Sequence, residues 1–322
     1  MRTVHDLTAV KPEPSVVTLG TFDGIHRGHR LIIESVCDEA RRNALRSVLV
    51  TFDPHPREVL RHDGERIYLL TTLEERLRIL NETPLDLCIV LAFTRDLSLL
   101  EADEFFHQVL VERIGARHLV VGSDHAFGKG RRGRIEQLLA LGAESGVVVT
   151  AVPELVLPGG PVSSTAIRRA LHAGDMRTAW EFLGRPYTLS GVVQRGEGLG
   201  RRIGFPTANI RIASERKLVP LDGVYAARVR TPDGIDRAAM VNIGRRPTVS
   251  DDDTRSVEAH ILDFDGDLYG ACLEAALMER LRDTIRFPSV EELARKLAED
   301  EREVRRLLAT EDLSRINNRI HT

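Results

Sequence analysis

The chain has 322 residues, of which 42% are hydrophobic and 29% are charged, and this length favours two domains over one. A formal net charge of −3 and a pI near 6.4 argue against a general binder of nucleic acid or anionic membranes. Cys37, Cys88 and Cys272 are widely spaced and form no CxxC pair, which is typical of reduced thiols. No apolar run reaches membrane-spanning length, so we expect a cytoplasmic protein with neither a membrane nor a nucleic-acid partner.

The first half alternates strand-like and helix-like segments. Apolar, β-branched runs predict strands at 16–19, 47–52, 87–93, 118–121 and 147–152. Amphipathic patterns predict helices at 27–40, 72–80, 101–113 and 135–143. This order favours a parallel sheet covered by helices on both faces, with ligands bound at the carboxyl ends of the strands.

The segment 20–29, between the first of these strands and its helix, is the strongest candidate site. Gly20 and Gly24 permit a sharp turn, and His26 and His29 stand at the start of the helix. Free backbone N–H groups and the helix dipole favour phosphate there, and Gly28 lets a phosphate approach the backbone. Two alternatives are ordinary surface histidines and a metal-binding pair, but no Cys or third His lies nearby at ligand spacing.

Two further segments of the first half carry anion-binding features. The loop 122–134, which includes Asp124, interleaves glycines with basic residues and predicts a positive flap over phosphates, or else a solvated surface loop. Ser163, Ser164 and Thr165 offer hydroxyls at the start of a helix. Arg168 follows one turn later, so the segment is either a second anion site or a simple helix cap.

The character of the chain changes after a short helix at 175–183 and the stop at 184–186, which predicts domains of 1–184 and 185–322. Short strand-like runs at 187–193, 223–230, 237–243, 256–262 and 272–278 predict a small antiparallel, Greek-key-like β-barrel. Ser289, three residues before Glu292, predicts the cap of a terminal helix that packs on the barrel.

The chemical centre of this second half is the glycine-rich segment 196–209. Its glycines and Arg201 are suited to wrapping phosphates. Thr207 and Asn209 lie two apart and offer oxygen ligands suited to Mg²⁺ bridged to phosphates. Glu258 alternates with apolar neighbours and is a candidate general base at a barrel mouth, the alternative being a glutamate on a solvent face.

Three motifs occur in this order along the chain: Gly20-x-Phe22-Asp23-Gly24-x-His26-x-Gly28-His29, Ser163-Ser164-Thr165-x-x-Arg168 and Gly204-Phe205-Pro206-Thr207-Ala208-Asn209. Further matches are Thr51-Phe52-x-Pro54-His55-Pro56, Asn242-Ile243-Gly244-x-Arg246-Pro247-Thr248 and Val257-Glu258-x-His260. Over nearly its whole length, the chain closely resembles the prokaryotic bifunctional riboflavin kinase/FAD synthetases (FMN adenylyltransferases).

The resemblance implies a Rossmann-like FMN adenylyltransferase domain followed by a riboflavin kinase barrel. The kinase would phosphorylate riboflavin to FMN with ATP and Mg²⁺, and the adenylyltransferase would convert FMN to FAD with release of pyrophosphate. It implies Glu258, His29 and Arg168 as catalytic residues, and Thr207 and Asn209 as the metal site. The implied nucleotide-binding residues are Gly20, Phe22, Asp23, Gly24, His26, Gly28, His29, Asp124, Ser163, Ser164, Thr165, Arg168, Gly198, Gly200, Arg201, Gly204, Pro206, Thr207 and Asn209.

The chain departs from the family pattern at His125, where the family has Phe, a difference that bears on flavin stacking or nucleotide contact in the N-terminal site. One alternative is a monofunctional riboflavin kinase with an inactive N-terminal domain, and another is a non-catalytic flavin carrier or regulator. The intact motifs around His26, Thr207 and Glu258 argue against both. The sequence leaves the oligomeric state open.

Overall fold

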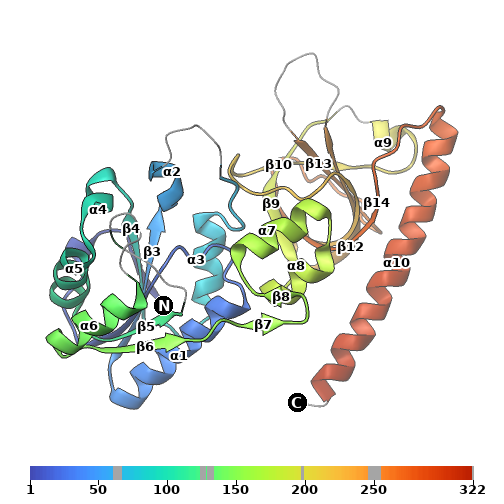
Figure 1. The fold of residues 1–322 in the computed structure, drawn as a ribbon. Coiled ribbons are helices and arrows are strands. Elements are labelled where there is room, and N and C mark those ends of the chain that lie inside the picture. Colours follow the sequence, from blue (N-terminus) through green and yellow to red (C-terminus); the bar gives the residue numbers. More distant parts are fainter. Residues whose placement is uncertain (61–66, 124–127, 129–133, 197–198, 246–254, 321–322) are drawn as a thin grey trace. The chain divides into compact units, whose positions relative to one another are not determined.

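The computed structural model describes residues 1–60, 67–123, 128, 134–196, 199–245 and 255–320, with side chains described as far as residue 309 of the last helix. The chain forms two units, Met1–Ser164 and Thr165–Thr322. Figure 1 shows their elements.

The first unit is built on a six-stranded sheet, all parallel, in the order β1-β4-β3-β2-β5-β6. Its strands are β1 (Arg2–Val4), β2 (Ser15–Leu19), β3 (Arg46–Asp53), β4 (Leu87–Ala92), β5 (Ala116–Gly122) and β6 (Val148–Val152). Its helices are a 3₁₀ turn (Leu7–Ala9), α1 (Arg27–Asn43), α2 (Pro56–Leu60), α3 (Leu73–Asn81), α4 (Arg95–Leu99), α5 (Ala102–Glu104), a π-helix (Phe105–Ile114) and α6 (Ile135–Ser145). A small hairpin, β7 (Val156–Leu157) with β8 (Gly160–Pro161), precedes the last residues of the unit. The chain order reverses around β2, and ligands of such sheets bind at the carboxyl ends of the strands at this point.

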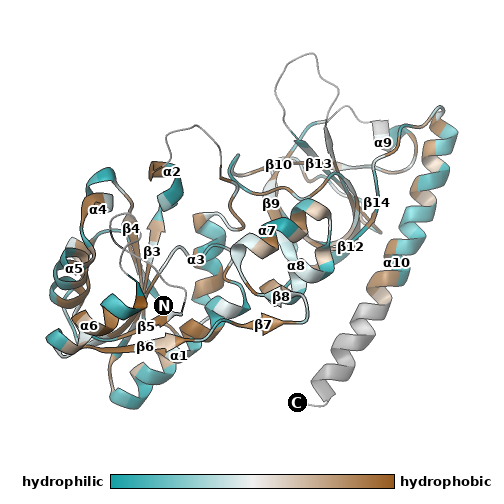
Figure 2. Ribbon diagram, viewed as in Figure 1, coloured by the Kyte–Doolittle hydropathy of each residue, from teal (hydrophilic) through white to brown (hydrophobic). Residues whose placement is uncertain are grey.

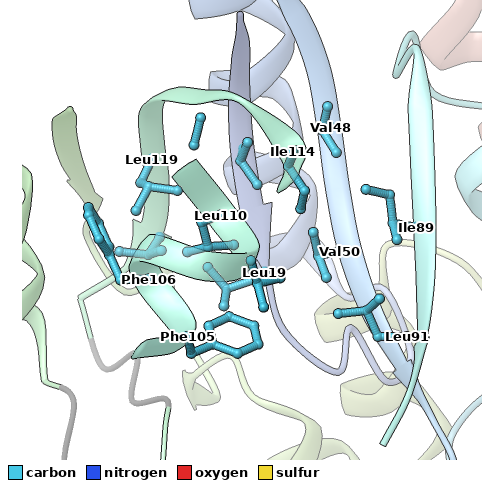
Figure 3. Packing of buried hydrophobic residues seen from close by; sticks show 14 of the residues in the cluster. Leu19, Val48, Val50, Ile89, Leu91, Phe105, Phe106, Leu110, Ile114 and Leu119 are labelled. Carbon is cyan, nitrogen blue, oxygen red and sulfur yellow. The ribbon is translucent and has the colours of Figure 1, made fainter. Parts of the chain in front are cut away.

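The four central strands of this sheet, β4, β3, β2 and β5, bury both faces, because helices cover both. On β3, Val48 and Val50 belong to one apolar cluster while Leu49 belongs to the other. The first cluster receives side chains of the π-helix and α6, and Figure 3 shows Phe105 and Leu110 packed against these strands. The second receives α1 and α3. This two-sided burial explains why the strands read as continuous apolar runs, which Figure 2 shows as hydrophobic colour along them.

The second unit is a closed six-stranded antiparallel barrel in the order β10-β13-β12-β11-β14-β9. Its strands are β9 (Tyr187–Gln194), β10 (Ala208–Ile212), β11 (Gly223–Arg230), β12 (Asp236–Arg245), β13 (Arg255–Ile261) and β14 (Cys272–Arg282). Its helices are α7 (Ser164–Ala173), which begins at the last residue of the first unit, α8 (Met176–Leu183), α9 (Leu199–Arg202) and α10 (Val290–Ile320). Closure leaves no strand edge unpaired.

Helix α10 covers part of the outer face of the barrel (Figure 1). Its Val304 and Leu308 pack against Ala226, Met240 and Met278. The helix begins as the sequence predicts, because the Ser289 hydroxyl accepts a hydrogen bond from the Glu292 N–H at 3.2 Å.

The predicted architecture is confirmed: a parallel N-terminal sheet, a C-terminal barrel and a terminal helix. The predicted helix over 101–113 is a short α-helical turn followed by a ten-residue π-helix. Strands β1 and β10 are additions that the sequence patterns did not predict. The compact units divide before α7. The predicted division into functional domains at residue 184 stays a prediction.

Candidate active sites

The segment after β2 is a strained turn held by two buried side chains. Phe22 (φ 48°) and Ile25 (φ 37°) adopt left-handed backbone conformations, as does Gly24 (φ 85°) between them. Phe22 is 3% exposed and Ile25 is fully buried, so apolar packing stabilises conformations that non-glycine residues rarely adopt. Strain of this kind persists where the surrounding structure over-determines it, and it is concentrated at functional sites.

The two histidines of this turn form one stacked pair at the start of α1. His26 is the N-cap of the helix, and its Nδ1 accepts a hydrogen bond from the backbone N–H of His29 at 3.3 Å. The two rings are 3.6 Å apart between centroids and 16° from parallel, and Phe22 lies 5.0 Å from the His29 ring. Because Nδ1 of His26 accepts, the neutral ring carries its proton on Nε2, where it can be donated to an anion.

The glycines of the turn make room for these aromatic rings. A Cβ atom at Gly28 would lie 3.3 Å from the His26 ring, and one at Gly20 would lie 3.4 Å from the Phe22 ring. The ring of His26 therefore fills part of the space that a side chain at Gly28 would need. That Gly28 also admits a phosphate to the backbone stays a prediction.

Asp23 is buried and binds the segment before α3. Its carboxylate accepts hydrogen bonds from the N–H groups of Leu70 (3.1 Å) and Thr71 (3.0 Å) and from the Thr71 hydroxyl (3.3 Å). The Thr71 hydroxyl accepts in turn from the Gly24 N–H at 3.0 Å. The Ser164 hydroxyl donates to the Asp23 carbonyl oxygen at 2.8 Å, so two predicted site segments meet here. Asp23 thus shapes the turn, and its predicted contact with nucleotide is untested.

Arg76 is a residue of this site that the motifs do not include. It is 4% exposed, and its Nη1 donates to the Thr21 carbonyl, the Thr51 hydroxyl and the Phe52 carbonyl. Burial lowers the pKa of its guanidinium, against the opposing charges of Asp23 and Asp53. An arginine on the otherwise apolar face of a predicted helix is the signal that could have identified it.

In the barrel, polar side chains form one row across neighbouring strands. Asn209 of β10 pairs with Gln194 of β9 on one side and with Glu258 of β13 on the other. Glu258 pairs in turn with Asn242 of β12. Directly paired residues share a face of a sheet, so these four side chains line one face. Their neighbours are buried in the barrel interior, for example Val193, Ile210, Val241, Val257 and Ala259. The row therefore lies on the outside of the barrel wall, not inside it.

The glycine-rich segment packs directly against this row. A Cβ atom at Gly196 would collide with the Asn209 amide, and one at Gly200 would collide with the Phe205 carbonyl and lie 3.5 Å from the Thr207 hydroxyl oxygen. Nδ1 of His260, on the same face of β13 as Glu258, lies 2.8 Å from the Pro206 carbonyl oxygen. The structure thus brings the motif 204–209 next to β13, the strand that carries Glu258.

Comparisons with known proteins agree for both units. A family model of FAD synthetase matches residues 8–166, and one of riboflavin kinase matches residues 183–308. A bifunctional riboflavin kinase/FMN adenylyltransferase of Escherichia coli K12 is 37% identical over 301 residues, which are 94% of this chain and 95% of that protein. One of Pseudomonas fluorescens is 38% identical over 311 residues, 96% of this chain and 98% of that protein.

The chain belongs to the bifunctional riboflavin kinase/FMN adenylyltransferase family. The predicted transferase with riboflavin kinase and FAD synthetase activities is thereby confirmed, and riboflavin, FMN and ATP are its substrates. A crystal structure described as a macrolide-efflux protein of Streptococcus pneumoniae superposes with a TM-score of 0.86 at 31% identity, covering 94% of this chain and 98% of that one. Within the described residues, no helix is both long enough and apolar enough to cross a bilayer.

Several predicted site features of this family member stay predictions. Asp124, His125, most of the basic flap and Gly198 lie outside the described residues. Thr165 is exposed, and Arg168 is half-buried in α7, in the second unit. Among the described residues, no group of three or more His, Cys, Asp or Glu is placed to hold a metal ion. The cytoplasmic location and the lack of membrane and nucleic-acid partners also stay predictions.

Proposed function

We propose that the barrel transfers the γ-phosphate of ATP to the 5′-hydroxyl of riboflavin with Glu258 as general base. The hydroxyl oxygen attacks the γ-phosphorus, the bond to the β–γ bridging oxygen breaks, ADP leaves, and the carboxylate takes the hydroxyl proton. The position of Glu258 between Asn209 and Asn242 supports this role. Amide side chains on both sides can orient a carboxylate without neutralising its charge.

Mg²⁺ fits the donor set of this site, and we assign it to Thr207 and Asn209. A hydroxyl and an amide oxygen are hard ligands, and Mg²⁺ commonly takes few ligands from protein and the rest from phosphates and water. Bound there, Mg²⁺ would neutralise charge on the ATP phosphates. Gly200, Arg201, Gly204 and Pro206 belong to the same proposed nucleotide site.

The N-terminal unit, in this proposal, adenylylates FMN at the turn between β2 and α1. An FMN phosphate oxygen attacks the α-phosphorus of ATP, and the bond to the α–β bridging oxygen breaks to release pyrophosphate. The nucleophile is already anionic, so the protein needs to position the phosphates and stabilise charge rather than remove a proton. The stacked His26–His29 pair and the positive end of the α1 helix dipole favour phosphate at this place. Arg168 and the hydroxyls of Ser163 and Thr165 are proposed contacts to the ATP phosphates.

The test is to follow flavins by chromatography after mixing the protein with riboflavin, ATP and Mg²⁺. Glu258→Gln should slow FMN formation by about 10²- to 10⁴-fold, the usual contribution of a general base. The same variant should still convert supplied FMN to FAD. Glu279→Gln, on the exposed side of β14, is the matched control and should be unchanged in both steps.

The second half of the test uses His29→Asn with supplied FMN. Loss of one donor to the reacting phosphates should slow FAD formation by about 10²- to 10³-fold, while FMN formation persists. The exposed His5 of the same unit provides the control His5→Asn. FMN that accumulates in the wild type without FAD would support a monofunctional kinase, and riboflavin left unchanged would support a carrier.

A further inference from the structure

Arg76 connects two segments of chain at the point where they leave the sheet. Just after β2, the Gly20 N–H donates to the Val50 carbonyl of β3 at 3.0 Å, which continues the hydrogen bonding between these two strands. One residue later, the Thr21 carbonyl accepts from Nη1 of Arg76 and from the Thr51 hydroxyl, the latter at 3.1 Å. The same Nη1 donates to the Thr51 hydroxyl (2.8 Å) and to the Phe52 carbonyl (3.2 Å). Nη1 of Arg76 therefore joins the two chain segments at the point where the backbone hydrogen bonds between β2 and β3 end.

Burying the guanidinium of Arg76 is energetically unfavourable. It is 4% exposed, no carboxylate of the described residues forms an ion pair with it, and its Nε has no hydrogen-bond partner among them. Burial of an unpaired cation is unfavourable, and apolar replacements of buried charges are often neutral or stabilising for a fold. Fold stability alone is thus a weak reason for an arginine at this position.

The atoms that Arg76 binds lie at the start of the turn between β2 and α1, where we propose that phosphates bind. Thr21 directly precedes Phe22, the first residue with a left-handed backbone, and the turn then runs through Gly24 and Ile25 to the His26 cap. Fixing the Thr21 carbonyl fixes the peptide plane from which this strained path departs. Phe52 directly precedes Asp53, the last residue of β3, so the same contact ties the turn to the neighbouring strand.

We propose that Arg76 is a positioning residue of the adenylylation site, which holds the turn so that His26 and His29 meet the ATP phosphates. This rests on the proposed assignment of FMN adenylylation to that turn. Arg76 does not itself contact the nucleotide in this proposal. Its guanidinium acts through Thr21, and the exposed Arg78 of the same helix, α3, serves as the control position.

The experiment measures steady-state FAD formation from supplied FMN in Arg76→Met, Arg76→Lys and the control Arg78→Met. In Arg76→Met we expect the KM for ATP to rise about tenfold while the KM for FMN stays within about twofold, since the turn is proposed to bind the ATP phosphates. A lower fraction of folded enzyme would reduce the apparent kcat and leave both KM values unchanged. In Arg76→Lys the KM for ATP should stay close to that of the wild type. In the native protein one nitrogen makes all three contacts, and a lysine ammonium carries three donors.

Kinase activity in the same preparations reports the amount of folded second unit and should match the wild type, and the unchanged KM for FMN reports a folded first unit. Thr51→Val is the second variant: it removes one of the three acceptors and the hydroxyl that also donates to Thr21, and should raise the KM for ATP about threefold. An unchanged KM for ATP in both Arg76→Met and Thr51→Val would overturn the proposal, as would equal effects of lysine and methionine at position 76. A wild type that forms FMN but never FAD would instead overturn the assignment of adenylylation, and needs no variant to be seen.

Discussion

Replacing Asp23 with asparagine tests how the turn is held in place. The carboxylate offers two oxygens to three donors on Leu70 and Thr71. An amide has one oxygen, so in Asp23→Asn an NH₂ group must face one of two backbone N–H donors in a buried environment. Losing one hydrogen bond to a charged acceptor and leaving a buried donor unsatisfied costs about 2 kcal/mol. That free energy corresponds to roughly thirtyfold in the equilibrium between closed and open forms of this contact.

Hydrogen exchange read by mass spectrometry measures this effect at the contact itself. Peptides that contain the Leu70 and Thr71 amides should exchange about thirty times faster in Asp23→Asn, if local opening limits exchange. Asp38→Asn is the matched control, because Asp38 pairs with Arg41 on the exposed surface of α1. Exchange within threefold of the wild type at these amides would refute the reasoning.

Two further predictions follow from buried titratable groups. Burial lowers the pKa of His118 below its ordinary 6.5, against a smaller opposing effect of Glu39. The unfolded state therefore binds more protons below this pH, so unfolding free energy should fall as pH drops below about 6.5, by at most about 1.4 kcal/mol per pH unit, and His118→Gln should flatten the slope in urea titrations. Burial raises the thiol pKa of Cys37 to about 11 and of Cys88 to about 12, whereas Cys272 is exposed. Iodoacetamide at pH 8 should modify one cysteine of the native protein, identified by peptide mapping, and modification of Cys37 or Cys88 at a similar rate would contradict the assignment.

The parts of the fold that sequence could predict are those in which one segment carries its own pattern. The core strands are apolar on both sides, and Ile33, Val36 and Ala40 mark the buried face of α1. Strand β10 escaped prediction because its alternating Ile210 and Ile212 follow directly after a glycine-rich stretch that reads as loop. The π-helix escaped because its hydrogen-bond pattern leaves no periodicity that an apolar run of this length can reveal.

The site was predictable where a motif names it and hidden where contacts join distant segments. The helix that begins after Thr72 could be predicted from sequence, whereas the hydrogen bond between Thr71 and Asp23 joins residues 48 positions apart. The same holds for Arg76, whose acceptors lie up to 55 positions away. Such contacts depend on which strands become neighbours, and local composition carries no information about that.

The proposed adenylylation and kinase sites both need rigidly placed side chains, and the backbone provides this differently in each. Phosphoryl and nucleotidyl transfer depend mainly on position and charge, so the protein must hold donors rigidly. In the proposed adenylylation site a strained turn has this role, and the buried Phe22 and Asp23 support that turn. In the proposed kinase site the strand register has this role, because backbone pairing places Glu258 next to Asn209 and Asn242. Substitutions of supporting residues should therefore damage the adenylylation site more readily than the kinase site.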